Sequence, residues 1–530
     1  MELLALLPPL AMLLLIGHFG VGALHWDEWG CEVPVLRAYL AGTLDWPAIH
    51  AQCNESRPAF SKLIWLFLTL ASGAADPRWE MFTGWAIVSA TALNLYRLSV
   101  LYLSPFRAAW LSVCVNALLF SAVQHENWLW GAQMMLFLPA LYLTIWLRIV
   151  TSPRTSANLQ VAAGALLAIL ATYSFANGFL LWPALLASLP LSTHFPKKHW
   201  RLRAAATWML ALLATLALYF HNYQRGDASP SYTAAIEHPL RAAQYVLIFL
   251  GGPFSISQPT LSAVAGLTLL AALAGFVRIT GLRTAAPWLI LSGYAVASAA
   301  LAAAGRVALG PQQALESRYG AFAVWLAVGV VSLGFVIQPR VGRVLPAAAL
   351  ALLGILHGLS YAQGVRSMHY RALGLRYHAA CLTFLFTVPG GDCADSYPAW
   401  SVDLLRESAP PLDQVGWLRP PLFSGQAIPE GFGKFAGGNL ELLDPGTSQW
   451  QLEGGVGGDP DAVVIAIRTR AGYVPIAVTQ ATRVVPMRVS PSAWRTLIGK
   501  STIPKGTEVA AFAYRATEPR WLQFGTARIQ

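Results

Sequence analysis

Long apolar runs separated by short polar stretches fill the chain from its N-terminus to about residue 361. Runs of about 20 apolar residues are long enough to cross the hydrocarbon core of a bilayer as helices. The pattern predicts about eleven crossings, at residues 3–24, 80–101, 108–123, 128–148, 157–173, 177–193, 204–221, 259–277, 285–304, 319–337 and 344–361. The first run has no Lys or Arg before it and no convincing cleavage site, so we interpret it as a retained helix; a cleaved signal peptide is the alternative.

Past residue 388 the pattern changes to short β-branched runs between Gly- and Pro-rich turns, as at residues 462–468, 472–478 and 507–514. Such runs predict strands. Residues 362–388, in which Arg366, Arg371 and Arg376 recur among apolar residues, predict an amphipathic connecting helix. We therefore expect a membrane domain at 1–361, a connecting helix at 362–388 and a small β-rich domain at 389–530.

The tryptophans of this last domain have two interpretations. Trp400, Trp417, Trp450 and Trp521 fit binding of an acceptor or a carbohydrate, and they equally fit the ordinary core of a lid or spacer.

Composition agrees with a membrane protein, because 56% of the residues are hydrophobic, only 12% are charged and the mean hydropathy is +0.51. The net charge of +11 does not indicate a nucleic-acid partner, since the basic residues are spread along short loops instead of gathering on one soluble face.

The signs of the charges predict the topology. Alternate short stretches between the crossings carry basic residues without acidic ones, which marks them as cytoplasmic: Arg97, Arg107, Arg148, Arg154, Lys197, Lys198, Arg201, Arg203, Arg278, Arg283, Arg340 and Arg343. The opposite loops, including a large first outer loop at 25–79, hold the acidic residues Asp27, Glu28, Glu32, Asp45, Glu55, Asp76, Glu80, Glu126, Asp227, Glu237 and Glu316. An odd number of crossings places the C-terminal domain on that outer side.

Residues 58–72 are apolar as well, but the segment is short and carries Lys62 near its middle, a costly residue at the centre of a bilayer. We interpret it as an interfacial or re-entrant helix; a crossing is the alternative. The cysteines fit the same topology: Cys31 with Cys53 and Cys381 with Cys393 are outer pairs that an oxidising compartment would permit to bond, or they are unpaired small apolar residues.

Three outer stretches carry candidate chemistry. In the first, Asp27 and Glu28 lie between two tryptophans just past a predicted membrane helix, where they fit a general base or the ligands of a cation and partial desolvation would raise a carboxylate pKa to a useful range; ordinary solvated loop charge is the alternative. In the second, His125, Glu126 and Asn127 precede an aromatic run; a helix N-cap by Asn127 is the plain alternative.

The third stretch ends in Arg318 and Tyr319 at the mouth of a helix. The planar fork of Arg318 suits a phosphate, or the side chain is an interfacial anchor. We expect Asp27, Glu55, Glu126 and Arg318 to meet at one outward-facing cavity.

This layout resembles the GT-C class of membrane glycosyltransferases, which includes protein O-mannosyltransferases and the aminoarabinose transferases of lipid A. The resemblance rests on a first helix followed by a large outer loop with Trp26-Asp27-Glu28, on residues 54–58 (Asn-Glu-Ser-Arg-Pro) before an apolar helix, and on many crossings with an outer C-terminal domain. Residues 126–131 and 317–319 are similar to short motifs of other bacterial membrane proteins. Ser56 departs from the pattern, since a His is expected there.

The resemblance implies sugar transfer from a polyprenyl-phosphate-linked donor to a glycan, lipid or protein acceptor, with inversion at the anomeric carbon. It implies Asp27 as the base, Glu28 as its assistant or as a ligand of a divalent cation, if one is used, and no other cofactor. Arg57 and Arg318 would hold the departing phosphate. The residues implied in substrate binding are Asn54, Glu55, Arg57, His125, Glu126, Asn127, Arg318 and Tyr319.

Two other functions stay open. A transporter or flippase of lipid-linked sugars would need polar groups inside the crossings, for which Asn94, Asn116 and Gln133 are thin support. A noncatalytic envelope assembly protein would not need the outer carboxylates. The bias towards Ala, Leu and Arg is typical of a GC-rich bacterial genome, and we expect the inner (plasma) membrane as the location.

Overall fold

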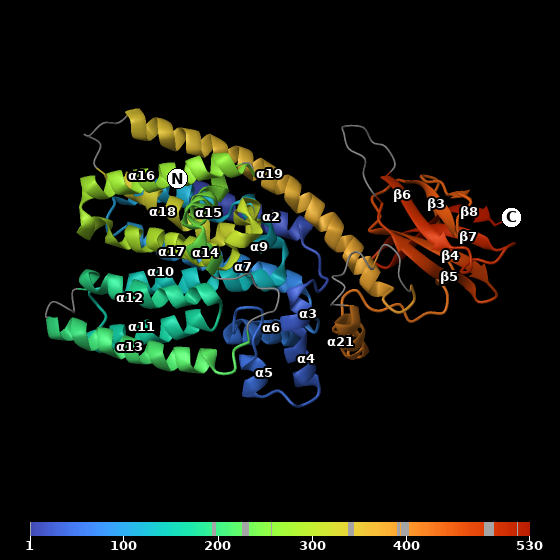
Figure 1. Cartoon of the computed structure of the whole chain (residues 1–530), viewed down its shortest axis with the longest axis horizontal. Helices are drawn as coiled ribbons and strands as arrows, with labels where there is room; N and C mark the ends of the chain where they lie inside the picture. Colours follow the sequence, from blue (N-terminus) through green and yellow to red (C-terminus); the bar gives the residue numbers. More distant parts are fainter. Residues whose placement is uncertain are drawn as a thin grey trace. The chain divides into compact units, whose positions relative to one another are not determined.

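The computed structural model describes residues 2–192, 198–224, 233–255, 257–337, 344–388, 393, 402–481, 492–516 and 518–529. The chain forms two compact units (Figure 1). The first, the helical unit, consists of Met1–Gly20, Trp46–Ile64 and Arg78–His369. The second, the mixed unit, consists of Val21–Asp45, Trp65–Pro77 and Tyr370–Gln530. Of the residues used in the sequence predictions, Lys197, Asp227, Arg340, Arg343 and Trp400 lie outside the described residues.

The helical unit is built from apolar helices. Those wholly within it are α1 (Glu2–Ala5), α2 (Leu7–Phe19), α5 (Trp46–His50), α8 (Pro105–Leu119), α9 (His125–Leu129), α10 (Leu138–Val150), α11 (Ala157–Thr172), α12 (Leu181–Ser188), α13 (Lys198–Phe220), α14 (Thr233–Glu237), α15 (Pro239–Gly251), α16 (Pro259–Thr280), α17 (Leu282–Arg306) and α18 (Gly320–Val336). Three helices have residues in both units: α6 (Ala59–Ser72), α7 (Pro77–Ser99) and α19 (Val344–Thr383).

Short 3-10 turns join several of these helices, and four of them carry site residues described below. They are η1 (Ala122–Gln124), η2 (Gly131–Leu136), η3 (Ala176–Leu180), η4 (Leu189–Leu191), η5 (Gly252–Phe254), η6 (Val307–Leu309), η7 (Pro311–Leu315) and η8 (Ser317–Tyr319).

Tryptophans lock α10, α11, α12 and α13 together. The rings of Trp146 and Trp208 meet edge to face with centroids 5.5 Å apart. Their indole N–H groups are satisfied inside the bundle, since Trp146 donates to Ser188 Oγ at 2.8 Å and Trp208 to the carbonyl of Val161 at 2.9 Å. Both rings lie 3.1 Å from the position that a Cβ of Gly164 would occupy, so a larger residue in α11 would have to push the two rings outward by a few tenths of an ångström.

Six helical stretches among the described residues are long and apolar enough to cross a membrane, judged by length and composition: Pro105–Leu129, Gly131–Val150, His199–Phe220, Pro259–Thr280, Leu282–Leu309 and Ser317–Val336. Three further predicted crossings fall on the shorter apolar helices Leu3–Phe19, Ala157–Thr172 and Ala176–Leu191. The predicted spans 80–101 and 344–361 fall on α7 and α19. The helical unit thus has the composition of a membrane protein.

Contacts within the helical unit follow the predicted alternation of loops. At the basic loops, the Arg107 guanidinium donates to the carbonyl of Ile337 at 3.2 Å, and Ser192 Oγ donates to Gln160 Oε1 at 2.7 Å. At the other loops, the Phe60 N–H donates to the carbonyl of Tyr173 at 3.1 Å. Each of these bonds joins two chain segments that the charge pattern assigns to the same side.

Helix α15 was not predicted. It is a 13-residue apolar helix in the stretch expected to be a loop, and it packs against α16, α17 and α18. At about 1.5 Å per residue it is too short to cross a bilayer alone. Its contact with α16 is backbone to backbone, because a Cβ on Gly251 would lie 1.8 Å from the carbonyl oxygen of Ser262.

The mixed unit combines short helices with two sheets. Its helices are α3 (Asp27–Cys31), α4 (Val33–Leu40) and α21 (Val402–Gln414), together with the last part of α19. Its strands are β1 (Gly433–Lys434), β2 (Glu441–Leu443), β3 (Gln449–Val456), β4 (Ala462–Thr469), β5 (Gly472–Thr479), β6 (Ser492–Gly499), β7 (Glu508–Arg515) and β8 (Arg520–Arg528). The strands predicted at 462–468, 472–478 and 507–514 are confirmed as β4, β5 and β7.

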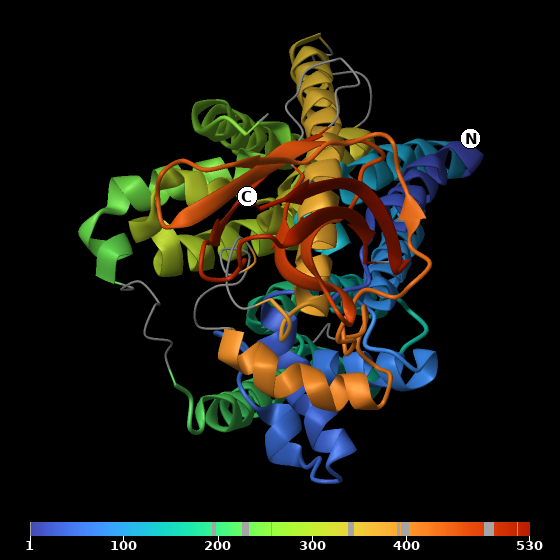
Figure 2. The same cartoon turned by 90° about the vertical axis from the view of Figure 1, so that its right-hand side faces the viewer.

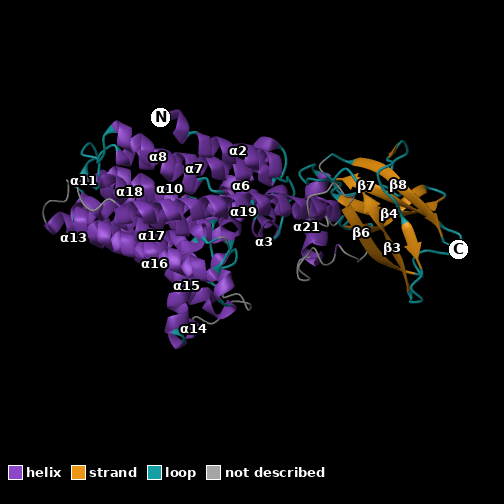
Figure 3. Ribbon diagram, turned by 90° about the horizontal axis from the view of Figure 1, so that it is seen from above, coloured by secondary structure: helices purple, strands orange, loops and turns teal. Residues whose placement is uncertain are grey.

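The sheets have the strand orders β1-β8-β7-β4-β5 and β2-β3-β6. Figure 2 shows how strongly these strands curve, and Figure 3 shows that the strands gather in the C-terminal part of the chain. Alternate residues of β4 enter two different cores: Val464 packs into one with Phe512, while Val463 packs into the other with Trp494. Both faces of β4 are therefore buried.

The first of these two cores depends on residues from the start of the chain. Trp29 of α3 and Leu36 of α4 belong to the same buried cluster as Phe384, Leu405 and Phe512. Helices α3 and α4, from the stretch predicted to be the first outer loop, thus share a core with the β-rich domain expected at 389–530, which the sequence pattern did not indicate.

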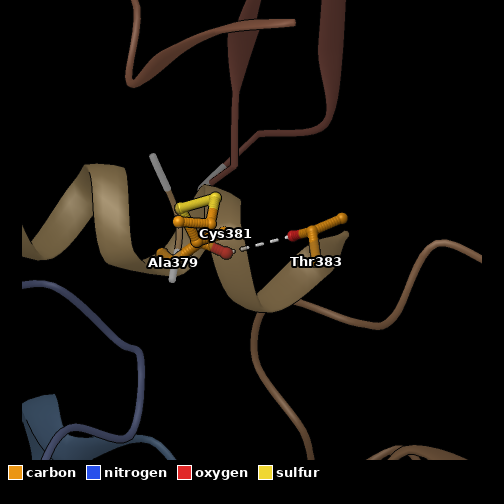
Figure 4. Close-up of a disulfide and its surroundings, with 4 residues drawn as sticks. Ala379, Cys381 and Thr383 are labelled. Atoms are coloured by element: carbon orange, nitrogen blue, oxygen red, sulfur yellow. Dashed lines mark hydrogen bonds between the residues drawn. A yellow bond between two sulfur atoms is a disulfide. The ribbon is translucent and has the colours of Figure 1, made fainter. Parts of the chain in front are cut away.

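One predicted cysteine pair is confirmed as a disulfide, Cys381 with Cys393, at the end of α19 (Figure 4). The Thr383 hydroxyl donates to the carbonyl of Ala379 at 3.2 Å in the same turn. Cys31 lies in the mixed unit and Cys53 in the helical unit.

Candidate functional site

The predicted site residues are divided between the two units. Asp27 and Glu28 belong to the mixed unit. The other predicted residues belong to the helical unit: Asn54, Glu55, Arg57, His125, Glu126, Asn127, Arg318 and Tyr319.

Glu126 joins two stretches of the helical unit that are far apart in the sequence. Its carboxylate Oε2 accepts from Ser317 Oγ at 2.9 Å and from the backbone N–H of Arg318 at 3.2 Å, and its own N–H donates to Ser317 Oγ at 3.2 Å. Ser317 and Arg318 form η8, which leads directly into α18. A carboxylate bound to N–H groups at the start of a helix is favourable, because the helix dipole is positive there.

Asn127 holds the same segment from the other side. Its side-chain amide donates to the carbonyl of Arg318 at 3.0 Å and to Gln124 Oε1 at 3.3 Å. The N-cap alternative for Asn127 is wrong, since the residue lies inside α9 and Gln124 occupies the N-cap position. The Arg318 backbone is thereby fixed on both sides, while its guanidinium lies 5.9 Å from the ring centroid of Tyr319.

A polar cavity of about 270 Å³ opens beside Glu126, wholly within the helical unit. Its walls come from η1 and α9, from η5 and the turn after it, from η7 and η8, and from α19. The lining residues are Val123, His125, Glu126, Gly252, Ser255, Ser257, Gln312, Leu315, Glu316, Ser317, Ser360, Gln363, Gly364 and Ser367. Hydroxyls, amides and carboxylates dominate this surface, which is typical of a site for a polar ligand.

Two contacts shape the α19 wall of the cavity. A Cβ on Gly364 would lie 2.3 Å from the carbonyl oxygen of Ala122, so only glycine lets α19 approach η1 this closely. On the same wall, Gln363 Nε2 donates to Ser257 Oγ at 2.9 Å. Ser257 has a φ of 58°, a left-handed backbone conformation that a serine rarely adopts.

The 54–57 motif is a tight turn. The N–H groups and carbonyls of Cys53 and Ser56 bond to each other at 2.8 and 2.9 Å, and Asn54 between them has a φ of 49°. Asn tolerates this conformation better than most residues. Next in the motif, Glu55 Oε1 lies 3.1 Å from Arg306 Nη2 in a half-exposed ion pair.

Arg57 is buried and is used to brace this turn. Its guanidinium donates to the carbonyls of Tyr219 at 2.6 Å, His50 at 2.9 Å and His221 at 2.8 Å. Two of these carbonyls belong to the C-terminal end of α13, where a cation is favourable. Lys62, also buried, donates to the carbonyl of Ala51 at 2.7 Å.

His50 lies between these cations. Burial lowers its pKa below the ordinary value, and the nearby charges of Arg57, Lys62 and His221 lower it further. The imidazole is therefore mainly neutral at pH 7, and its Nδ1 lies 3.3 Å from Arg57 Nη1.

In the mixed unit, Asp27 and Glu28 form the first turn of α3 but differ in exposure. Glu28 is 1% exposed and its Oε2 accepts from the backbone N–H of His25 at 2.5 Å, while its own N–H donates to the His25 carbonyl at 3.1 Å. These two bonds close a turn over residues 25–28. Asp27 is half-buried, and Trp26 before it is largely exposed with a φ of 47°.

Basic side chains lie near the two carboxylates of this motif. The rings of His25 and His378 meet edge to face at 4.9 Å. Burial, together with the charges of His378 and Arg371, holds the pKa of His25 well below its usual range. Glu32, the residue that follows α3 in the chain, is also buried, with 1% of its surface exposed.

No group of three or more His, Cys, Asp or Glu side chains in the described ranges is placed to hold a metal ion. The structure therefore assigns no ligands to the divalent cation that the resemblance allows.

No family model, curated protein or solved structure matches this chain. The site is accordingly described from its own geometry. That geometry joins Glu126, Asn127 and Arg318, two of which belong to the four residues expected to meet at one cavity. Of the other two, Glu55 pairs with Arg306 and is not among the lining residues, and Asp27 belongs to the mixed unit. The geometry adds Ser255, Ser360 and Gln363, which sequence reasoning missed. The available signal was a set of single polar residues spaced along otherwise apolar helical stretches.

Proposed function

We propose that this protein is a membrane glycosyltransferase that moves a sugar from a polyprenyl-phosphate-linked donor to an acceptor on the outer face of the inner membrane. The observation that carries the proposal is the polar cavity of the helical unit. Glu126 lines this cavity, and so does Ser317, which directly precedes Arg318 in the chain. A transferase of this kind needs a pocket for a hydroxyl-rich group and a cation close to it for the leaving phosphate.

The proposed reaction is a single displacement. The acceptor oxygen forms a bond to the anomeric carbon as the bond from that carbon to the phosphate oxygen breaks, which inverts the carbon. Asp27 takes the acceptor proton, and polyprenyl phosphate leaves with the electron pair. We assign the base to Asp27 because it is half-exposed, while Glu28 and Glu32 are each 1% exposed.

The leaving phosphate is assigned first to Arg318. Its backbone is held by Glu126 and Asn127, so its guanidinium starts from a fixed point. Arg57 donates to three backbone carbonyls, and its part in the proposal is to keep the 54–57 turn in shape. The proposal also keeps the eleven predicted crossings and an outer C-terminal domain.

The test compares cell envelopes by mass spectrometry. A strain lacking the protein is complemented with the wild type, with Asp27→Asn or with Asp403→Asn; Asp403 is an exposed carboxylate of α21 in the same unit. We expect the deletion strain to lack one sugar increment on an envelope component. The wild type and Asp403→Asn restore it, and Asp27→Asn lowers it by about 10²-fold or more, as expected for loss of a general base.

Two outcomes would contradict the proposal. An envelope that is unchanged by the deletion excludes a transferase for these cells. Full restoration by Asp27→Asn, with the protein present at the wild-type level, removes Asp27 as the base. If the deletion instead makes a lipid-linked sugar accumulate on the inner leaflet, the protein is a flippase.

A further inference from the structure

We infer that the cavity beside Glu126 binds one uncharged, hydroxyl-rich sugar ring and discriminates against acidic sugars. The inference rests on the proposed function, since it names the sugar class that the transferase would move. It concerns the side chains that line the cavity, several of which, such as Ser255, Ser360 and Gln363, the sequence patterns did not single out.

The size of the cavity suits a small ligand. A volume of about 270 Å³ has room for a sugar ring with its hydroxyls. The close approach of α19 to η1 at Gly364 brings two of the cavity walls together.

The lining matches hydroxyl groups. A sugar hydroxyl donates one hydrogen bond and accepts others, and serine hydroxyls and glutamine amides do the same. The cavity presents several of each: Ser255, Ser257, Ser317, Ser360, Ser367, Gln312 and Gln363. A site rich in such groups binds a polyol better than an apolar ligand, which would leave them without partners.

One part of the wall is built for more than packing. Ser257 is held at a φ of 58°, and its hydroxyl accepts from Gln363 Nε2 at 2.9 Å. This bond orients the Gln363 amide on the face of α19 that lines the cavity. Unfavourable backbone conformations of this kind are found preferentially at ligand sites.

The charge of the lining gives the discrimination. Two carboxylates, Glu126 and Glu316, line the cavity, and none of the described lining residues is Lys or Arg. A sugar that carries its own carboxylate would bring a third negative charge beside them. The donor phosphate then belongs outside the cavity, towards Arg318.

The experiment measures binding without transfer. The full-length protein in nanodiscs is titrated with neutral methyl hexosides and with the matching methyl hexuronosides, and binding is followed by saturation-transfer difference NMR. We expect the neutral hexosides to bind at least tenfold more tightly than the hexuronosides, in which a carboxylate replaces the CH₂OH group.

Two variants test the site. Gln363→Leu should weaken hexoside binding about tenfold or more, while Gln313→Leu, beside the lining residue Gln312 but not itself in the lining, should leave it unchanged. Thermal unfolding of both variants checks that the fold is kept. Should Gln363→Leu unfold, Ser367→Leu takes its place.

The inference is overturned if no hexoside binds, if the hexuronosides bind as well as the hexosides, or if neither Gln363→Leu nor Ser367→Leu weakens binding. Its failure is separable from that of the transferase. Selective hexoside binding with an envelope unchanged by the deletion retains the cavity assignment and removes the reaction. A lost sugar increment together with tighter binding of the hexuronosides retains the transferase reaction and removes the cavity assignment.

Discussion

Glu126 and Glu28 look alike in the sequence, each an acidic residue beside aromatics in an outer loop, yet the structure uses them differently. Glu126 accepts from a hydroxyl and a backbone N–H at the start of a helix and borders a polar cavity. Glu28 is 1% exposed and closes a turn beside the apolar core of the mixed unit. One carboxylate can face a ligand, and the other is committed to the fold.

The difference shows that burial separates chemistry from architecture within a single motif. Asp27 and Glu28 are neighbours, but only Asp27 keeps part of its surface exposed. The neighbouring Trp29 belongs to the same core that receives the β4 and β7 strands. Loss of function on mutation of this motif therefore needs a stability measurement beside it.

The largest effect is expected for Glu28→Ala. It leaves the buried His25 N–H without its acceptor and a void beside Trp29, which together cost about 2–3 kcal/mol. Hydrogen exchange followed by mass spectrometry should speed up in β4 and β7 and stay unchanged in α17. Glu28→Gln keeps an acceptor and is the matched control; equal changes in both units would contradict the assignment of α3 to the mixed unit.

A smaller effect, about 1–2 kcal/mol, is expected for Glu126→Ala in the helical unit. Ser317 Oγ and the Arg318 N–H lose their acceptor, so the start of α18 should fray. The measurement is hydrogen exchange in peptides covering residues 315–324, with Glu126→Gln as the conservative comparison. Unchanged exchange there, with hexoside binding reduced, would mean that Glu126 serves the ligand and not the helix.

The smallest effect concerns pH. The folded pKa of His25 lies below its unfolded value near 6.5, so its contribution to stability is present above about pH 6.5 and is lost as the pH falls towards the folded pKa. At a pH between the folded and the unfolded pKa, His25 binds a proton in the unfolded state but not in the folded state. Acidification from pH 7.5 to 5 should lower the thermal midpoint of the wild type more than that of His25→Gln; equal shifts would assign the sensitivity elsewhere.

The sequence predicted the helices and strands that depend on residues close together in the chain. Long apolar runs predicted most of the long helices of the helical unit, and β-branched runs predicted β4, β5 and β7. Helix α15 was missed because an apolar run of its length is ambiguous between helix, strand and loop. The place of α3 and α4 beside α21 in the mixed unit was missed because it depends on contacts between segments far apart in the sequence.

The candidate site divides in the same way. His125, Glu126 and Arg318 were predicted because adjacent polar and aromatic residues stand out in a loop. Ser360 and Gln363 were not, because a single polar residue on an apolar helix looks ordinary until the opposite wall is known. Arg57 was noticed for its charge, but its role came from the three carbonyls around it.

The packing of α3 and α4 with α21 has a consequence for biosynthesis. Arg37 of α4 bonds to Ser408 of α21, 371 positions later in the chain, and Leu405 of α21 shares a buried cluster with Trp29 and Leu36. Trp29 and Leu36 therefore stay uncovered until the ribosome has delivered α21. Chains that stop before α21 would leave that surface bare, which makes premature termination a hazard for quality control as well as for activity.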